Sequence, residues 1–265
     1  LLPDIMNTEK VCRRFEDLLS DPLVWIDMCE STGCTLPPAS FRRSLKEKRD
    51  EIEETYGKLP EIYERIFEKN PFRPNIVPPL LSSEQMKEKY GWIFGGDINV
   101  QEEDVKGEEP ITRCISSSGE SMLMIKIDLE KEGVPEWILD HVRPRIVVSY
   151  WLKPTDECTS IFRFITQLLM RDEECVNDTP ARSKYRCKSW SQRTKVDYEK
   201  VELTFKDYSI GARKISIMAE ERGFRSLARA PRVYGVKLAN LRVRIEMPND
   251  VRWLTEEMFP DPKRR

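Results

Sequence analysis

The amino-acid sequence predicts an α+β fold in which a small helical part precedes an antiparallel β-sandwich. Two observations support this fold class. Before residue 70, apolar residues recur at the spacing of helices with one buried face. Residues 70–79 then contain four prolines, and beyond them apolar and polar residues alternate as in strands. Seven or more short strands separated by turn residues are typical of an antiparallel sandwich.

The first 36 residues predict short helices. Residues 8–19 place apolar side chains on one helical face, at Val11, Phe15, Leu18 and Leu19. The residue before Pro22 resists helical geometry, so this helix is expected to end there. A second helix is expected from Leu23 to Cys29, with Trp25 as its large buried anchor.

Residues 37–69 predict a charged helical linker. From residue 41 to residue 69, eight basic and eight acidic side chains interleave, which is typical of a solvated helix rather than a nucleic-acid-binding arm. Gly57 and Pro60 are expected to divide the segment into two helices. A thin apolar stripe is expected to dock on a neighbouring domain or on a partner; it consists of Phe41, Leu45, Ile52 and Tyr56.

The clearest strand signal lies late in the chain. Residues 201–205 alternate between apolar and polar, Asp207 to Gly211 carry turn chemistry, and Ile215 and Ile217 resume the alternation. The other predicted strands cover residues 91–94, 122–129, 145–152, 161–169, 214–218 and 240–247. The tail from residue 249 to residue 265 ends in three basic residues and is expected to be solvated.

Composition limits the class of protein. The chain of 265 residues is 39% hydrophobic and 34% charged, with a net charge of −2, so neither a nucleic acid nor a membrane is expected as a partner. No signal peptide or membrane-spanning run is visible. Seven scattered cysteines without a C-x-x-C pair indicate reduced thiols, and hence the cytoplasm or the nucleus.

Catalytic signals are missing from the sequence. His141 is the single histidine and lies in a short predicted helix, which favours a structural or surface role. No nucleotide, nucleophile-elbow or metalloprotease motif is present. No pattern places two carboxylates across a cleft, as a glycosidase requires. The sequence therefore predicts a non-enzymatic protein without a cofactor or metal.

The helical N-terminus resembles the second half of an F-box. The residues that carry this resemblance are Asp4-Ile5-Met6, Val11-Cys12-Arg13-Arg14-Phe15, Leu18, Pro22 and Trp25. The first helix of that motif, with its Leu-Pro-Glu type of opening, is not visible in the chain. The resemblance implies that the adaptor protein Skp1 binds Ile5, Val11, Cys12, Phe15, Leu18 and Trp25.

The strand-rich region resembles the F-box-associated (FBA) domain of the sugar-recognising F-box proteins. The matching residues form an ordered series: Asn70-Pro71, Gly91-Trp92, Gly95-Gly96-Asp97, Ile127-Asp128-Leu129, Glu132-Gly133, Leu139-Asp140, Pro144, Ile146-Val147-Val148, Trp151, Cys158, Leu168-Leu169, Phe205, Asp207-Tyr208, Gly211, Arg213 and Tyr234-Gly235. The family has a galactose-binding-like sandwich of about ten strands, so the resemblance implies this fold here.

The resemblance implies four parts and one function. The parts are half an F-box at 1–36, a linker at 37–69, an FBA sandwich at 70–248 and a tail at 249–265. The implied function is substrate recognition in an SCF (Skp1–cullin–F-box) ubiquitin ligase, with cullin-1 reached through Skp1. A stand-alone lectin-like or protein-binding module without a ligase role is the alternative, and the residues upstream of Leu1 would distinguish the two.

Two loops depart from the sugar-binding pattern of the family, whose loops carry aromatic rings that stack on sugars. The expected loop from Cys114 to Ser121 has no aromatic residue, and Phe224 is the only aromatic residue in the expected loop from Glu221 to Val233. An N-glycan ligand is therefore not expected. Arginines suit carboxylates and phosphates, so an acidic or phosphorylated protein segment is predicted, although the arginines could instead only solubilise the loop. The predicted substrate-binding residues are Ser117, Ser118, Phe224, Arg225, Arg229 and Arg232.

Overall fold

A computed structural model describes most of the chain and divides it into two compact units. The described residues are 17–34, 49–78, 80–96, 98–117, 120–155, 159–174, 182–191, 196–224 and 235–248. The helical unit contains residues up to Arg73, the segment Leu129–Pro144, and the chain from Ile245 onwards. The sandwich unit contains Pro74–Asp128 and Arg145–Arg244.

The helical unit contains helices α3 (Pro22–Thr32), α5 (Arg49–Tyr56) and α6 (Leu59–Lys69), and the single-turn π-helix η1 (Ile138–Val142). Asp21 caps the start of α3 by accepting a hydrogen bond from the Leu23 backbone, and Gly33 ends the helix in a left-handed conformation. The expected break between two linker helices is confirmed at residues 57–58, although Pro60 lies inside the first turn of α6.

Trp25 fixes α3 against α6, as expected of a buried anchor. The Trp25 side chain is 3% exposed, its ring lies 6.0 Å from the ring of Phe67, and its Nε1 donates to the Leu19 carbonyl at 2.8 Å. Further along the chain, Val134, Trp137 and Ile138 are fully buried in the same unit. Arg73 and Glu132 form an ion pair at 2.5 Å that links the end of α6 to the turn before η1.

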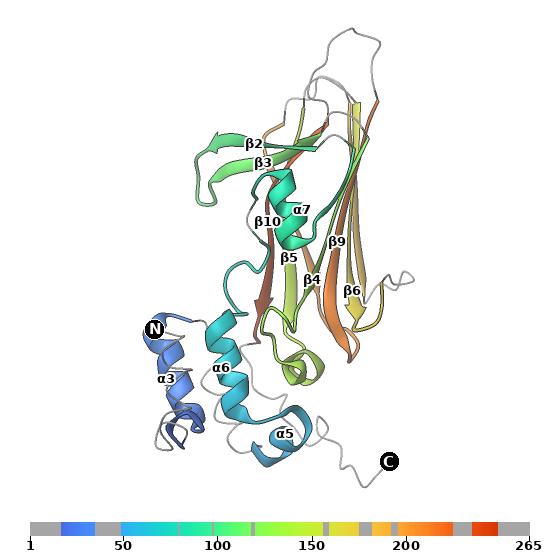
Figure 1. The fold of residues 1–265 in the computed structure, drawn as a ribbon. Helices are drawn as coiled ribbons and strands as arrows, with labels where there is room; N and C mark the ends of the chain where they lie inside the picture. Colours follow the sequence, from blue (N-terminus) through green and yellow to red (C-terminus); the bar gives the residue numbers. More distant parts are fainter. Residues whose placement is uncertain are drawn as a thin grey trace. The chain divides into compact units, whose positions relative to one another are not determined.

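The sandwich unit contains two five-stranded antiparallel sheets (Figure 1). Sheet A has the strand order β1-β4-β9-β6-β7 and sheet B has the order β2-β3-β10-β5-β8. Helix α7 (Ser83–Tyr90) precedes β1 and begins with a capping box formed by Ser82 and Gln85. The strands are β1 (Ile93–Gly95), β2 (Ile98–Val105), β3 (Ile111–Ser117), β4 (Ser121–Asp128), β5 (Arg145–Pro154), β6 (Thr159–Met170), β7 (Ser183–Trp190), β8 (Glu199–Phe205), β9 (Ala212–Phe224) and β10 (Val236–Glu246).

Alternate residues of each strand point between the sheets and form the core. Tyr150 of sheet B stacks on Phe164 of sheet A with ring centroids 4.0 Å apart, and both side chains are fully buried. The turn before β9 uses Asp207 and Gly211 with positive φ, while Tyr208 between them is fully buried. The predicted antiparallel sandwich is therefore confirmed, including the strand, turn and strand around residues 201–218.

Several predicted boundaries were wrong. The strands β2, β3 and β7 were not predicted, and β9 extends to Phe224 rather than ending near Met218. The strand expected from Gly91 begins at Ile93, because Gly91 ends α7 in a left-handed conformation. Of the helix expected over residues 8–19, residues 17–19 are described and are helical, and the rest lies outside the described residues. Of the apolar linker stripe, Phe41 and Leu45 lie outside the described residues, whereas Ile52 and Tyr56 belong to α5.

The outer face of sheet B carries an ion-pair network centred on Glu109, which precedes β3. The Glu109 carboxylate accepts from Trp151 Nε1 at 3.2 Å, pairs with Arg242 at 3.3 Å and also pairs with Lys200. The hydrogen bond from Lys200, which outweighs partial burial, holds the pKa of Glu109 below its ordinary value. Beneath the network lies a small apolar cluster formed by Ile111, Cys114 and Ala239, with Val105, Trp151 and Tyr198 packed against it.

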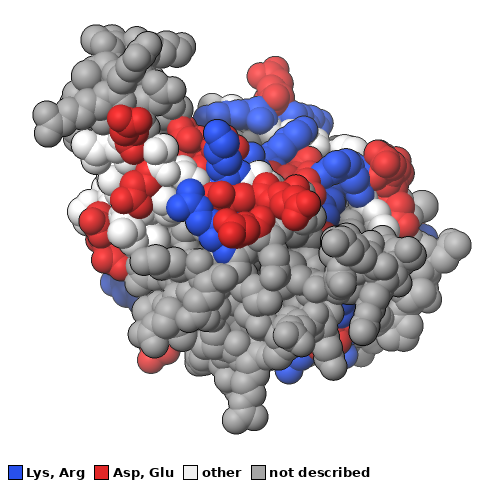
Figure 2. Space-filling model, turned by 90° about the horizontal axis from the view of Figure 1, so that it is seen from below, with Lys and Arg blue, Asp and Glu red and all other residues white. Residues whose placement is uncertain are grey.

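Two surface observations agree with the composition. Among the described residues, no helix has the length and apolar character needed to cross a membrane. On the face shown in Figure 2, basic and acidic side chains lie next to one another and neither sign gathers alone.

Candidate functional site

One end of the sandwich unit collects the strand ends around the predicted ligand-binding loops. β3 ends at Ser117 and pairs there with Ile98 at the start of β2. β4 begins at Ser121, which pairs with Glu221 of β9, and the last residue of β9, Phe224, pairs with Thr159 at the start of β6. The two loops that sequence reasoning selected therefore start and end at the same edge of the fold. We call this region the loop end.

A pocket of about 230 Å³ lies at the loop end, beside the first residues of β4. Three carboxylates and one guanidinium group line it, together with small or flexible residues. A pocket with this lining can accept hydrogen bonds from hydroxyl or ammonium groups, and can donate them from the guanidinium group. The described lining residues are Gly95, Glu120, Ser121, Met122, Glu220, Glu221 and Arg222, none of which is aromatic.

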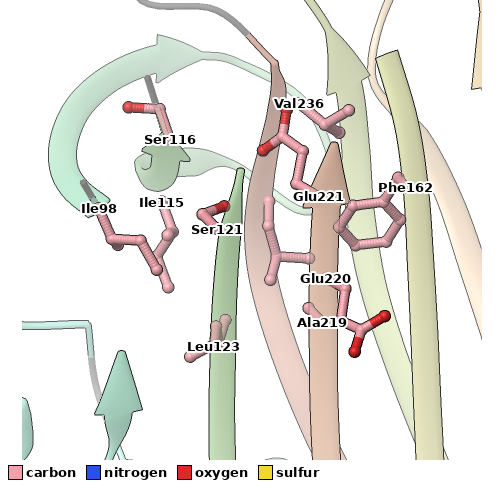
Figure 3. Close-up of a pocket in the computed structure, with 11 residues that line it drawn as sticks. Ile98, Ile115, Ser116, Ser121, Leu123, Phe162, Ala219, Glu220, Glu221 and Val236 are labelled. Carbon is pink, nitrogen blue, oxygen red and sulfur yellow. The ribbon is translucent and has the colours of Figure 1, made fainter. Parts of the chain in front are cut away.

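Just inside the loop end, a small cavity of about 20 Å³ lies between the two sheets (Figure 3). Its volume is roughly that needed by one water molecule. Ile98 and Ile115 of sheet B face Leu123 of sheet A across it. The Glu221 side chain lies beside Val236 at the opening, whereas Glu220 turns to another side. Glu221 is 6% exposed, so its carboxylate belongs to the interior and Glu220 to the surface.

Two glycines allow the chain to pass close to neighbouring groups at the loop end. A Cβ atom at Gly235, which has φ +126°, would lie 1.7 Å from a carboxylate oxygen of Glu221. The Gly235 backbone also exchanges two hydrogen bonds with Thr155, at 2.9 Å and 2.8 Å. A Cβ atom at Gly96, which has φ +79°, would lie 2.3 Å from the Glu120 carbonyl oxygen. Both positions require glycine because both geometry and space exclude a side chain.

The structure describes only the residues at the ends of the two predicted substrate-binding loops. Ser117 is the last residue of β3 and Phe224 the last of β9, so both belong to strands rather than loops, which corrects the boundaries expected from sequence. The same correction moves Cys114 into β3 and Glu221 into β9. Ser118, Arg225, Arg229 and Arg232, together with the side chains of Ser117 and Phe224, lie outside the described residues.

The predicted Skp1-binding residues are also described only in part. Trp25 is buried within the helical unit, while Leu18 is 48% exposed. Ile5, Val11, Cys12 and Phe15 lie outside the described residues. The assignment of these residues to a Skp1 surface stays a prediction.

Sequence reasoning missed the acidic residues that line the pocket. Ile215, Ile217 and Ala219 occupy alternate inward positions of β9, and Glu221 continues the same series. A carboxylate at an inward position interrupts the apolar alternation that predicts a strand, so the end of β9 was assigned to a loop. The continued period of two was the signal that could have found it.

The sandwich unit is therefore a β-sandwich with a pocket at its loop end. The chain belongs to the family described as the F-box associated region, whose match covers residues 67–245. No curated protein matches the chain.

Solved structures similar to the chain include several β-sandwiches. The enzymatically active domain of bacteriophage CBA120 tailspike protein 4 has a TM-score of 0.37 at 12% identity, and the match covers 66% of this chain and 22% of that one. TmCBM61, solved with β-1,4-galactotriose, has a TM-score of 0.37 at 11% identity over 66% and 99% of the two chains. The CBM22-1 xylan-binding domain of Paenibacillus barcinonensis Xyn10C has a TM-score of 0.33 at 9% identity over 59% and 86%. These likenesses concern the sandwich fold alone.

Proposed function

We propose that this protein is a substrate-recognition subunit of an SCF ubiquitin ligase. The observation that carries the proposal is the match to the F-box associated region over residues 67–245, behind a helical segment with the spacing of an F-box. Such a subunit breaks no bond itself. It raises the concentration of a substrate near the ubiquitin-charged enzyme, which acts in the cytoplasm or nucleus.

The helical unit offers an apolar surface for Skp1. Leu18 and Leu23 are 48% and 56% exposed, while the nearby Trp25 holds α3 in place from the buried side. Leu18 lies just before α3 and Leu23 in its first turn, and exposed leucines close together are the kind of side chain that a partner protein covers. We assign Leu18 and Leu23 to the Skp1 interface, with Trp25 as the residue that positions α3.

The loop end offers the surface for the substrate. Its arginines, at positions 222, 225, 229 and 232, can grip carboxylates or phosphates through paired hydrogen bonds. The described part of the pocket also carries Glu120 and Glu220, which would repel a uniformly acidic ligand. We therefore propose a protein segment in which acidic or phosphorylated residues contact the arginines and a donor group reaches the carboxylates.

Skp1 binding is tested by co-purification with the protein extended upstream to a complete F-box. We expect a Skp1 complex that recruits cullin-1, and at least a tenfold weaker complex for the L18E/L23E variant. I210E is the matched control, because Ile210 is 54% exposed but lies in the sandwich unit, and its complex should be unchanged. A protein with a complete F-box that stays free of Skp1 would favour the stand-alone binding module instead.

The substrate class is tested with the variant R225A/R229A/R232A. We expect it to lose capture of acidic and phosphorylated peptides while still binding Skp1. The control K58A/K106A/K206A removes the same charge from exposed positions elsewhere, and its capture should be unchanged. Equal capture by both variants would show that the loop arginines only solubilise the chain.

A further inference from the structure

The outer face of sheet A carries a row of apolar side chains that crosses all five strands. The sheet register pairs Ile93 with Met124, Met124 with Met218, Met218 with Ile165 and Ile165 with Tyr185. The neighbouring residues along each strand, such as Leu123, Ile217 and Phe164, point into the core and are buried. We call Ile93, Met124, Met218, Ile165 and Tyr185 the apolar row.

The apolar row is accessible at both ends. Ile93 is 48% and Tyr185 is 50% exposed, and the three central side chains are partly exposed. Adjacent strands lie about 4.8 Å apart, so the row is about 19 Å long. A continuous exposed apolar feature of this length is a candidate contact surface.

The next register step beside the row carries a single ion pair. Arg163 of β6 lies opposite Glu220 of β9 and contacts it at 3.1 Å, with side-chain exposures of 45% and 28%. Met122 and Cys187 complete this second row on the two outer strands. The positive and negative charges therefore lie on the adjacent strands β6 and β9, one on each.

This pattern is complementary to itself under one twofold rotation. An axis that runs parallel to the strands, between β9 and β6, places β9 over the second copy's β6 and β4 over its β7, and leaves β1 without an opposing strand. Glu220 then faces the second copy's Arg163, Met218 faces Ile165, and Met124 faces Tyr185. No pair of like charges meets: Lys126 would face Ser183, and Arg222 would face Ile161.

We propose that the outer face of sheet A is a homodimer interface, formed by two copies packed face to face about this axis. Sheets that pack face to face cross at about 30°, so the central pairs stay opposed while the outer pairs drift apart. Each dimer contains the Glu220–Arg163 contact twice, because an isologous interface uses every contact twice. The inference goes beyond the proposed ligase role and does not depend on it.

The size of the face limits the strength of the dimer. Three gaps of about 4.8 Å between the four opposed strands, by eight residues of about 3.3 Å, give about 380 Å² on each copy, or about 760 Å² in total. This area is smaller than that of a standard specific interface. The dimer should therefore be weak and transient, and should form only at high local concentration.

Sedimentation equilibrium of the 265-residue chain tests the proposal with charge-swapped variants. We expect the unmodified chain to dimerise below several hundred micromolar, and R163E and E220R each to raise the Kd at least tenfold through like charges across the axis. R163E presents two carboxylates and E220R two guanidinium groups, so an equimolar mixture should form a heterodimer. The double variant R163E/E220R should dimerise as the unmodified chain does.

A matched ion pair on the other sheet provides the control. Arg244 and Glu202 lie 3.4 Å apart on the outer face of sheet B, with exposures of 30% and 46%. R244E and E202R should leave the Kd unchanged. Circular dichroism and thermal unfolding confirm that each variant folds, and M218Q tests the row without altering charge. A chain that stays monomeric at several hundred micromolar, or a mixture that does not associate, overturns the proposal.

Discussion

The two outer faces of the sandwich unit differ in how far their apolar side chains are covered. The outer face of sheet B covers a small apolar cluster with ion pairs around Glu109, so that its charges are matched within one chain. The outer face of sheet A leaves Ile93 and Tyr185 half exposed and has Arg163 and Glu220 as a central pair. On sheet B the ion pairs cover the apolar cluster, whereas on sheet A the apolar row stays partly exposed, which suits the surface proposed above to contact a second copy. The two faces therefore differ in how the strand register distributes apolar and charged side chains.

The largest expected effect comes from the core that separates the two faces. Phe164 and Ile165 are neighbours on β6, but Phe164 stacks on Tyr150 between the sheets and Ile165 belongs to the apolar row. F164A should lower the free energy of unfolding by about 3–5 kcal/mol, whereas I165A should cost about 1 kcal/mol or less. Urea unfolding at low protein concentration measures both. An equal cost for the two would mean that Ile165 is as buried as Phe164.

The second effect concerns the thiols on the two faces. Cys114 is buried beneath the network of sheet B, and burial raises its pKa to about 11, while Cys187 is exposed beside Arg163 on sheet A. At pH 8 about one Cys114 thiol in a thousand is ionised, and the thiolate is the reactive form. Alkylation should therefore be at least about a hundredfold slower at Cys114 than at Cys187. Peptide mass spectrometry at low micromolar protein measures it, and similar rates would contradict the burial of Cys114.

The smallest effect tests the ion-pair network of sheet B. E109Q should lower the free energy of unfolding by about 1 kcal/mol at pH 7, since two cations lose their charged partner. Because the folded pKa of Glu109 is depressed, its contribution is present above the unfolded pKa and is lost as pH falls through the folded pKa. The difference between E109Q and the unmodified chain should therefore shrink in acid. E202Q, which removes a single exposed partner, should change stability by less than about 0.5 kcal/mol.

The sequence was sufficient for the fold class because central strands bury alternate residues. Leu123, Ile125 and Ile127 of β4 show this period clearly, and so do the strands around the turn at Asp207. It was insufficient for the edge strands β2 and β7, and also for β3, which lies between β2 and β10. β7 has basic residues at its inward positions: Lys184 lies over the Phe205 ring and Lys188 pairs with Glu199. The aliphatic parts of these lysine side chains cover the edge of the core while their ammonium groups reach solvent. The inward positions of β7 are therefore not apolar residues, and the alternation that marks a strand is not visible in the sequence.

The candidate site was predicted less completely than the fold. The resemblance to the F-box-associated family selected the two loops at the loop end, but not the strand ends that surround the pocket. Glu221 is an inward position of β9 occupied by a carboxylate, and along the chain only the period of two that runs through Ile215, Ile217 and Ala219 marks it as buried. Its place is defined by contacts from other strands, such as Ser121 and Phe162, which a local pattern does not contain.

The fixed position of Gly235 also bears on how this scaffold tolerates change. Its two hydrogen bonds to Thr155 and its close approach to Glu221 hold the chain immediately before β10. Doubling the length of a loop whose two ends are held costs only about 0.6 kcal/mol of closure entropy. We therefore expect insertions between β9 and β10 to change the stability of the sandwich unit little.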